Sequence, residues 1–227
     1  MKQNSIIYQI FPRNHSKERT FKKIEEDLAR ISSLGINIIY LMPIHEIGLK
    51  ERKGKYGSPY AIKDYYSISS DLGNLEDFKS LVNTTHKLGM KIILDMVFNH
   101  TSPDNILLQN HESYYYHKDG KVTNKVSKWT DIIDLETSKK ETQDYLIEVL
   151  KYWTSHEVDG FKFDVASVIP INFFIRARKE LGDKIIFIGE SVGDKDKFRK
   201  RGFFVNEDNE MYILHLIVFI IIIVFLI

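Results

Sequence analysis

Short apolar runs alternate with amphipathic stretches along most of the chain, and this alternation restricts its fold more than any other feature. Five runs are rich in β-branched and aromatic residues and are too short for helices, which is typical of strands buried on both faces. They cover residues 6–11, 36–42, 91–98, 160–165 and 184–188. Each is followed by polar or Gly- and Pro-containing sequence that predicts a loop.

Amphipathic helices are expected between these strands, because apolar residues recur there every three or four positions. The helices extend over about 20–35, 74–89, 138–153 and 171–181. Asn74 and Asp77 are placed to cap the second helix, and Ser138 and Glu141 have capping-box spacing at the start of the third. Gly35 follows the first helix, as a C′ residue does.

Strands that alternate with helices predict parallel βαβ units, which either form an open sheet or close into a barrel. Periodicity does not distinguish the two arrangements. The segment from about 101 to 137 is long and rich in Tyr, His, Lys and Asp, and we interpret it as a small excursion domain or a lid over a site. With 227 residues, the chain is shorter than the roughly 250 of a complete β/α barrel.

Composition excludes several classes of function. The 32 Lys and Arg residues balance 31 Asp and Glu residues, so nucleic acid and anionic membrane surfaces are not expected partners. The absence of cysteine excludes disulfides, thiolate metal sites and a thiol nucleophile. Residues 1–5 lead directly into the first strand and do not resemble a leader peptide, which predicts a cytoplasmic location.

Acidic residues follow the predicted strands. Asp95 lies within the third strand, with Asn99 and His100 just past its end, while Asp164 ends the fourth strand and Glu190 follows the fifth. A single acid at such a position more often caps a helix or accepts a loop hydrogen bond. In a β/α barrel, however, the carboxyl ends of all strands meet at one face, so three acids from three strands would converge there.

Two converging carboxylates suit the hydrolysis of an acetal between sugars. One group protonates the leaving oxygen, and the other stabilises or attacks the oxocarbenium-like carbon. Carboxylates roughly 5 to 5.5 Å apart carry this out with retention of configuration. The ends of neighbouring strands in a barrel are compatible with such a distance.

Three segments resemble the first three signature regions of the α-amylase family, glycoside hydrolase family 13, in the correct order. They are Asp-Met-Val-Phe-Asn-His at 95–100, Gly-Phe-Lys-Phe-Asp-Val-Ala at 160–166 and Ile-Gly-Glu-Ser at 188–191. Residues 57–65 are similar to the family's loop after the second strand, and 132–135 to its fifth conserved stretch. The likeness extends from about Ile6 to about Tyr212. It implies a TIM-type (β/α)8 barrel, incomplete with about five of eight strands, and an excursion after the third.

The resemblance also implies roles for individual residues. Asp164 would be the catalytic nucleophile and Glu190 the general acid/base. Four residues would bind substrate or shape its site: Tyr60, Asp95, His100 and Lys162. Among them, Tyr60 would stack on the sugar next to the cleaved bond, His100 would hydrogen-bond a hydroxyl of that sugar, and Asp95 would hold the architecture of the site. The face of Tyr60 suits the apolar side of a pyranose, although ordinary loop packing would also explain an aromatic residue there.

No cofactor is needed for this chemistry, but a structural calcium ion is a possibility that the resemblance raises. Asn99 and Asp134 match positions that hold calcium in many relatives. Oxygen ligands fit a hard cation, yet a full shell needs about six to eight of them and only two are identified.

The chain departs from the family pattern in two places. Lys162 stands where the family has Arg two residues before the nucleophile, and a flexible ammonium holds carboxylates less firmly than a planar guanidinium, although either would help to keep Asp164 ionised. The Asn-His-Asp set of the family's fourth region, which supplies a third acid, is absent from the sequence. Three of the expected strands are absent with it.

An apolar tail takes their place at residues 213–227. As a helix it would be about 22 Å long, short of the roughly 30 Å of a hydrocarbon core. We interpret residues 1–212 as a partial catalytic barrel and the tail as the product of a frameshift after Tyr212. A membrane anchor and an artefact of sequence assembly are the alternatives.

The sequence therefore predicts a retaining glycoside hydrolase that acts on α-1,4-glucans or maltooligosaccharides, with activity impaired by truncation. A transglycosylase or isomerase of the same family would share the carboxylates. A non-enzymatic, membrane-associated amylase-like protein tethered through 213–227, or an inactive pseudogene product, is the remaining alternative.

Overall fold

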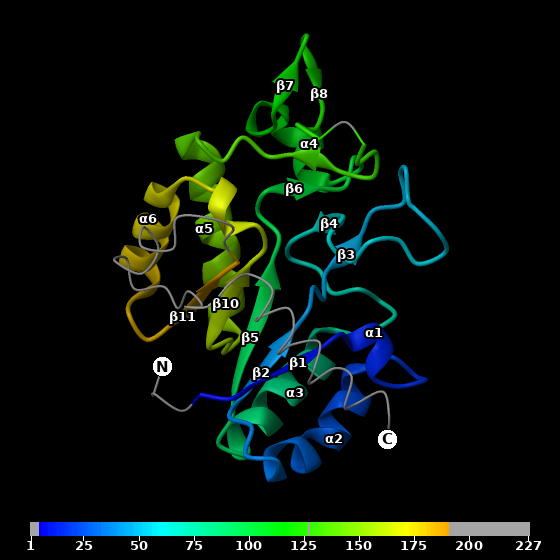
Figure 1. Ribbon diagram of the computed structural model, residues 1–227, viewed down its shortest axis with the longest axis vertical. Coiled ribbons are helices and arrows are strands. Elements are labelled where there is room, and N and C mark those ends of the chain that lie inside the picture. Colours follow the sequence, from blue (N-terminus) through cyan, green and yellow to red (C-terminus); the bar gives the residue numbers. More distant parts are fainter. Residues whose placement is uncertain (1–4, 127, 191–227) are drawn as a thin grey trace.

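A five-stranded parallel sheet forms the centre of the molecule in the computed structural model, which describes residues 5–126 and 128–190 (Figure 1). The strands are β1 (Ile7–Ile10), β2 (Ile38–Leu41), β5 (Lys91–Met96), β10 (Gly160–Phe163) and β11 (Ile186–Gly189), hydrogen-bonded in that order. Every neighbouring pair is parallel. The five predicted strands are thus confirmed, and they form the partial β/α barrel expected from the sequence.

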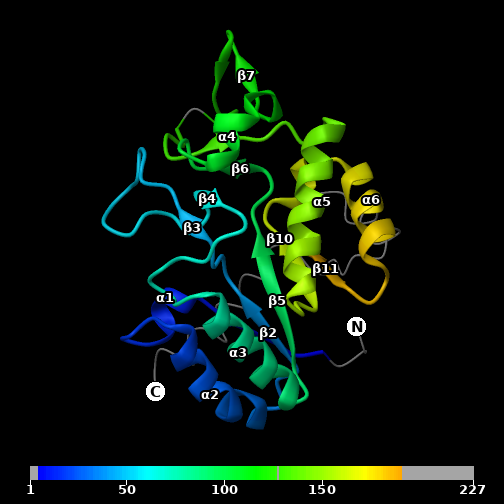
Figure 2. The same cartoon turned by 180° about the vertical axis from the view of Figure 1, so that it is seen from behind.

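Helices cover one side of this sheet (Figure 2). They are α1 (Pro12–His15), α2 (Phe21–Ser33), α3 (Leu75–Lys87), α5 (Lys140–Ser155) and α6 (Ile171–Leu181). Helix α2 packs against α3, and α5 packs against α6. The main hydrophobic core lies between these helices and the sheet, where Trp153, Phe161 and Phe163 are fully buried.

Caps determine where the helices begin. Asn74 and Asp77 form the predicted capping box at α3, because Asn74 Oδ1 accepts from the Asp77 N–H at 3.1 Å and Asp77 Oδ2 accepts from the Asn74 N–H at 2.9 Å. The capping box predicted from Ser138 at α5 is wrong. That helix has Lys139 at its N-cap and no side-chain cap, and the Ser138 hydroxyl donates to Glu136 Oε1 at 2.6 Å instead.

The opposite face of the sheet carries a smaller apolar cluster, made by Ile38, Tyr40, Ile93 and Ile186. Side chains two positions apart on a strand share a face, so Asp95 lies on the same face as Ile93. Asp95 is paired in register with Lys162 on the neighbouring strand. This face therefore changes from apolar to charged toward the carboxyl ends of the strands.

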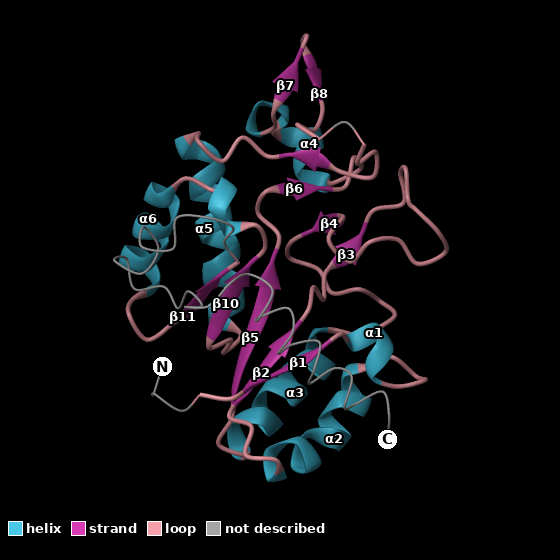
Figure 3. Cartoon of the chain, viewed as in Figure 1, coloured by secondary structure: helices cyan, strands magenta, loops and turns pink. Residues whose placement is uncertain are grey.

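Irregular segments extend from the carboxyl ends of the strands (Figure 3). A hairpin of β3 (Glu46–Ile47) and β4 (Ile62–Asp64) follows β2, and η2 (Ala166–Val168) follows β10. The excursion after β5 contains β6 (His100–Thr101), α4 (Ile106–Asn110), η1 (Glu112–Tyr114), β7 (His117–Lys118), β8 (Lys121–Val122) and β9 (Ile133–Asp134). β6 pairs with β9, and β7 pairs with β8, each antiparallel. This arrangement is the loop-rich excursion expected after the third strand.

The proposed apolar tail at 213–227 lies outside the described residues, as does the end of the proposed 1–212 barrel segment. Within 5–126 and 128–190, none of the helices combines the length and the apolar character that a membrane span requires.

Candidate active site

Three adjacent strands bring three acids to one end of the sheet. Asp95 is the fifth residue of β5, Asp164 directly follows β10, and Glu190 directly follows β11. The strands lie side by side, and the Asp164 N–H donates to the Met96 carbonyl at 3.0 Å while the Glu190 N–H donates to the Phe163 carbonyl at 3.2 Å. The backbone ladder thus continues into both acidic residues, which fixes their positions relative to one another.

Lys162 lies between these acids. Its Nζ is 2.6 Å from Glu190 Oε2, 3.4 Å from Asp95 Oδ1 and 3.7 Å from Asp164 Oδ1. We call Asp95, Asp164 and Glu190 together with Lys162 the carboxylate cluster. Burial of the ammonium lowers the pKa of Lys162, but the three carboxylates outweigh that effect and the pKa is raised. Lys162 is therefore a permanent positive charge shared by three acids.

The shared ammonium also limits how far apart two of the acids lie. Asp164 Oδ1 and Glu190 Oε2 both contact Nζ, so they cannot be farther from each other than those two contact distances added together. This upper limit applies to that pair of oxygens, and it includes the roughly 5 to 5.5 Å of retaining carboxylate pairs. The geometry is compatible with retention.

Asp164 is difficult to ionise in this position. Burial raises its pKa to about 7, Lys162 opposes the rise, and the charges of Asp95 and Glu190 add to it. The sequence-based expectation that Lys162 favours ionised Asp164 is correct in direction, but burial dominates. Around neutral pH, Asp164 therefore exists in both its protonated and its ionised form.

Asp95 is fully buried and has a partner that the sequence analysis missed. The Tyr40 hydroxyl donates to Asp95 Oδ2 at 2.5 Å, from β2 on the other side of β5. Burial raises the pKa of Asp95, while Lys162 and the Tyr40 hydrogen bond lower it. A tyrosine within an otherwise aliphatic buried strand needs a partner for its hydroxyl, and that requirement could have directed attention to Tyr40.

Tyr60 is brought to the cluster by the loop before β4. It is half-buried and packs at the edge of the core, so both of its predicted explanations have a structural basis. Burial raises the pKa of its hydroxyl, with Asp95, Asp164 and Glu190 raising it further and Lys162 lowering it. The hydroxyl therefore lies in the electrostatic field of all four cluster residues.

His100 lies in β6 and is buried. Burial lowers its pKa to about 4, opposed by Asp131, so the ring is neutral at pH 7. Its Nδ1 is 3.2 Å from Asn99 Nδ2. Among the described contacts none joins His100 to the carboxylate cluster, and its role toward a sugar hydroxyl stays a prediction.

Asn99 and Asp134 supply two of the ligands that a calcium ion would need, and calcium binding stays a prediction. Asp134 Oδ2 already accepts the Lys125 N–H at 2.9 Å, and the Asn99 carbonyl accepts the Leu135 N–H at 2.9 Å. Within 5–126 and 128–190, no group of three or more His, Asp or Glu side chains is arranged to hold a metal. Two residues fall short of the six to eight oxygens of a calcium shell.

Comparison with known proteins extends the likeness to nearly the whole chain. Residues 9–214 match the family model described as the alpha amylase catalytic domain. An alpha-amylase from Lactobacillus plantarum is 42% identical, with a TM-score of 0.81, over 92% of this chain and 50% of that one. A maltogenic alpha-amylase from Thermotoga neapolitana is 39% identical, with a TM-score of 0.82, over 87% of this chain and 48% of that one.

A curated relative shows the same family with a different named activity. The alpha-1,4-glucan:maltose-1-phosphate maltosyltransferase of Picrophilus torridus is 31% identical over 86% of this chain and 35% of its own length. The chain thus spans about a third of this relative and about half of the solved amylases. The family match and the parallel strands with their carboxylates lead to one conclusion: the chain belongs to the α-amylase family, glycoside hydrolase family 13, and its sheet is part of a TIM barrel.

Proposed function

We propose that the carboxylate cluster carries out retaining cleavage of α-1,4-linked glucans or maltooligosaccharides. The single observation that supports this most is the contact of one ammonium, Lys162 Nζ, with all three acids. It holds two carboxyl groups at a spacing compatible with a covalent glycosyl-enzyme intermediate. The relatives named as amylases and glucan maltosyltransferases support the substrate class.

In this proposal, Asp164 attacks the anomeric carbon while Glu190 protonates the leaving glycosidic oxygen. Asp164 suits attack because its side chain is mostly buried, whereas that of Glu190 is more exposed and able to exchange protons with water. After the first product leaves, Glu190 removes a proton from the incoming water, whose oxygen displaces Asp164. Tyr60 stacks on the sugar next to the cleaved bond, and His100 hydrogen-bonds one of its hydroxyl groups from the excursion. The fully buried Asp95 holds the architecture of the site.

Hydrolysis and transfer differ only in the second acceptor. If water attacks the glycosyl-enzyme, the protein is a hydrolase, and if a sugar hydroxyl attacks, it is a transferase. The maltosyltransferase relatives are the reason to keep both under test. Product analysis on maltooligosaccharides separates the two, because a transferase forms products longer than the substrate.

The decisive experiment traps the intermediate. A 5-fluoro glycosyl fluoride of the α-gluco series forms a slowly hydrolysed ester with the nucleophile, and peptide mass spectrometry then locates the added mass. We expect the label on the peptide that contains Asp164, and none in Asp164→Asn. We also expect Asp164→Asn to lower kcat by about 10⁴-fold or more, since a nucleophile is lost.

The matched control is Asp183→Asn, because Asp183 is an exposed acid outside the cluster. Its kcat should stay within about twofold of the unmodified chain. Label on another acid, or unchanged turnover in Asp164→Asn, would contradict the assignment. The non-enzymatic alternative predicts neither label nor turnover.

A further inference from the structure

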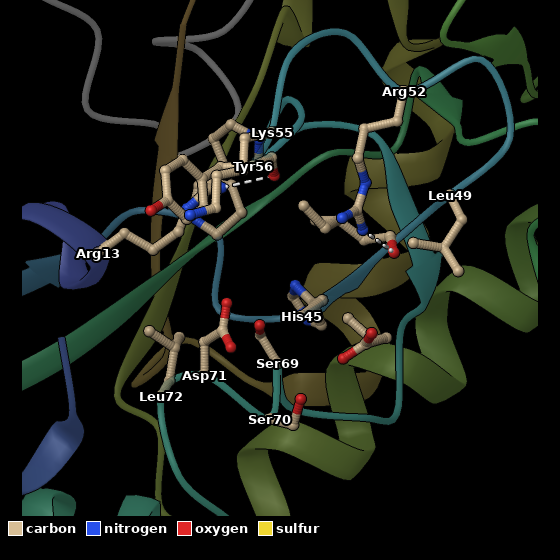
Figure 4. A pocket seen from close by; sticks show the side chains of 14 residues that line it. Arg13, His45, Leu49, Arg52, Lys55, Tyr56, Ser69, Ser70, Asp71 and Leu72 are labelled. Carbon is tan, nitrogen blue, oxygen red and sulfur yellow. Dashed lines mark hydrogen bonds between the residues drawn. The ribbon is translucent and has the colours of Figure 1, made fainter. Parts of the chain in front are cut away.

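A cavity of about 380 Å³ lies beside the hairpin β3–β4, and none of the three acids of the carboxylate cluster lines it. Its polar lining includes the cations Arg13, Arg52 and Lys55, the carboxylates Glu46 and Asp71, and the uncharged His45 and Ser69 (Figure 4). Figure 4 shows His45 in the middle, with Arg52 and Lys55 on one side and Ser69, Ser70 and Asp71 on the other. A second hollow of about 250 Å³ shares Arg13 and Tyr56 with it and adds Arg19. We call the two together the cation cavity.

Four cations of the cation cavity have no carboxylate partner within ion-pair distance in the described part of the chain: Arg13, Arg19, Arg52 and Lys55. By contrast, Lys53 of the same loop contacts Asp131 at 2.6 Å. Burial lowers the pKa of Arg13, and Arg52 and Arg19 lower it further against the opposing effect of Asp71. These four cations lie against two carboxylates of the lining, Glu46 and Asp71, which leaves an excess of positive charge. The chain as a whole has a formal charge of only +1, so this excess is not a general property of its surface.

Backbone contacts hold the two central guanidinium groups in place. Arg13 donates to the Tyr56 carbonyl at 2.8 Å and to the Gly57 carbonyl at 3.3 Å, and Arg52 Nε donates to the Gly48 carbonyl at 2.9 Å. Each guanidinium has five N–H donors, so donors remain for a ligand. A guanidinium that is already oriented loses less entropy when it binds an anion.

His45 is the second and independent indication of a ligand. Its side chain is 2% exposed, and neither ring nitrogen has a hydrogen-bond partner among the described residues. The ring packs edge-on against Trp153 and Tyr65, with centroids 5.4 Å and 6.1 Å away, and it lines the cavity. Burial lowers its pKa to about 3, so it is a neutral imidazole with one donor and one acceptor. A buried polar group without a partner is costly unless something in the cavity satisfies it.

We propose that the cation cavity binds a phosphate monoester of a small polyol, with Arg52, Lys55 and Arg13 around the phosphate and His45, Ser69 and Asp71 toward the hydroxyl groups. Guanidinium groups match phosphate oxygens in geometry and charge. Neutral imidazole, hydroxyl and carboxylate groups offer both donors and acceptors, which suits a polyol body. The cavity volume falls within the range of small-molecule sites and exceeds what a bare phosphate ion needs.

Isothermal titration of the full chain with inorganic phosphate, glucose 6-phosphate and glucose tests this assignment. We expect glucose 6-phosphate to bind more tightly than inorganic phosphate and glucose not to bind measurably at the same concentrations. Lys55→Glu should weaken both phosphate ligands by about tenfold, because it places a negative charge beside the bound anion. Lys50→Glu is the matched control, since Lys50 is an exposed lysine of the same loop that does not line the cavity.

Each result has a stated meaning. If inorganic phosphate binds more tightly than glucose 6-phosphate, the ligand of the cavity is the free phosphate ion, and the polyol part of the proposal is wrong. Equal binding of glucose, equal effects of Lys55→Glu and Lys50→Glu, or no binding of either phosphate at millimolar concentration would overturn the site. Asp164→Asn should leave this binding unchanged, so failure of the cavity proposal and failure of the proposed catalytic function are distinguishable.

Discussion

The carboxylate cluster and the cation cavity differ in how their charged side chains are paired. In the cluster, three acids surround one buried ammonium, and every charged group has a partner within the protein. In the cavity, cations gather around an uncharged buried imidazole without carboxylate partners in the described part of the chain. The difference indicates that the side chains of the cluster are positioned by one another before substrate arrives. The cations and the imidazole of the cavity, by contrast, still have hydrogen-bonding groups available to a ligand.

The two sites should differ most in the stability that is lost when a lysine of each is replaced. Lys162→Met leaves Asp95 buried without its counter-charge, and removal of one partner from a buried pair costs about 3 to 5 kcal/mol. Lys55→Met should change the free energy of unfolding by less than about 1 kcal/mol, because Lys55 is exposed. Urea unfolding of both variants at pH 8 measures the two values. Equal losses in the free energy of unfolding would show that Lys162 contributes no more to stability through its ion pairs than Lys55 does.

The pH dependence of stability should reflect the same contrast. Asp164 has a pKa of about 7 in the folded chain against an ordinary value of 3.8. Between these two pH values, the folded state therefore binds a proton at Asp164 that the unfolded state does not. Its contribution is complete below about pH 4 and is lost as pH rises toward 7, a change of a few kcal/mol at most. His45, with its pKa lowered to about 3, has the opposite slope, since its contribution is present above pH 6.5 and lost as pH falls.

The two slopes can be separated by subtraction. The free energy of unfolding of Asp164→Asn minus that of the unmodified chain should become more positive as pH rises from 4 to 7, because the variant lacks the ionisable group. Chemical denaturation at several pH values provides this difference. A difference that does not change with pH would mean that Asp164 ionises at an ordinary pKa.

Removing one hydroxyl from each region should give the smallest effect. Tyr40→Phe removes the donor to Asp95, and loss of a hydrogen bond to a charged group costs about 1.5 to 3 kcal/mol. Tyr56→Phe in the cation cavity should cost less than about 0.5 kcal/mol, since Tyr56 is exposed. Thermal unfolding of both variants compares them. If Tyr40→Phe proves as mild as Tyr56→Phe, the hydrogen bond to Asp95 adds little.

Local patterns in the sequence predicted most of the fold. Helix α6 begins and ends at the predicted residues, and the five parallel strands overlap the predicted runs. Burial on one or both faces of an element produces a regular spacing of apolar residues, and this spacing is visible in the sequence. The failure at Ser138 has a local cause as well. Its hydroxyl had a second acceptor, Glu136, within two residues, and spacing alone does not show which acceptor is used.

Contacts between distant segments account for what the sequence did not predict. The partnership of Tyr40 with Asp95 joins residues 55 positions apart, and the cation cavity combines Arg13 with a loop more than 40 residues later. Convergence of the acids was predictable, since a parallel sheet places all carboxyl ends at one edge. The dominance of burial over Lys162 in setting the pKa of Asp164 was not, because it depends on how tightly the surrounding chain packs.

The order of the strands in the sheet follows their order along the chain. During synthesis, each strand therefore emerges after the neighbour with which it pairs, so the sheet can grow from one edge without waiting for a distant segment. Chains are made at roughly 5 to 20 residues per second, far more slowly than a helix forms or a small chain collapses. The first βαβ unit thus has time to fold on the ribosome, where it provides the template for the next.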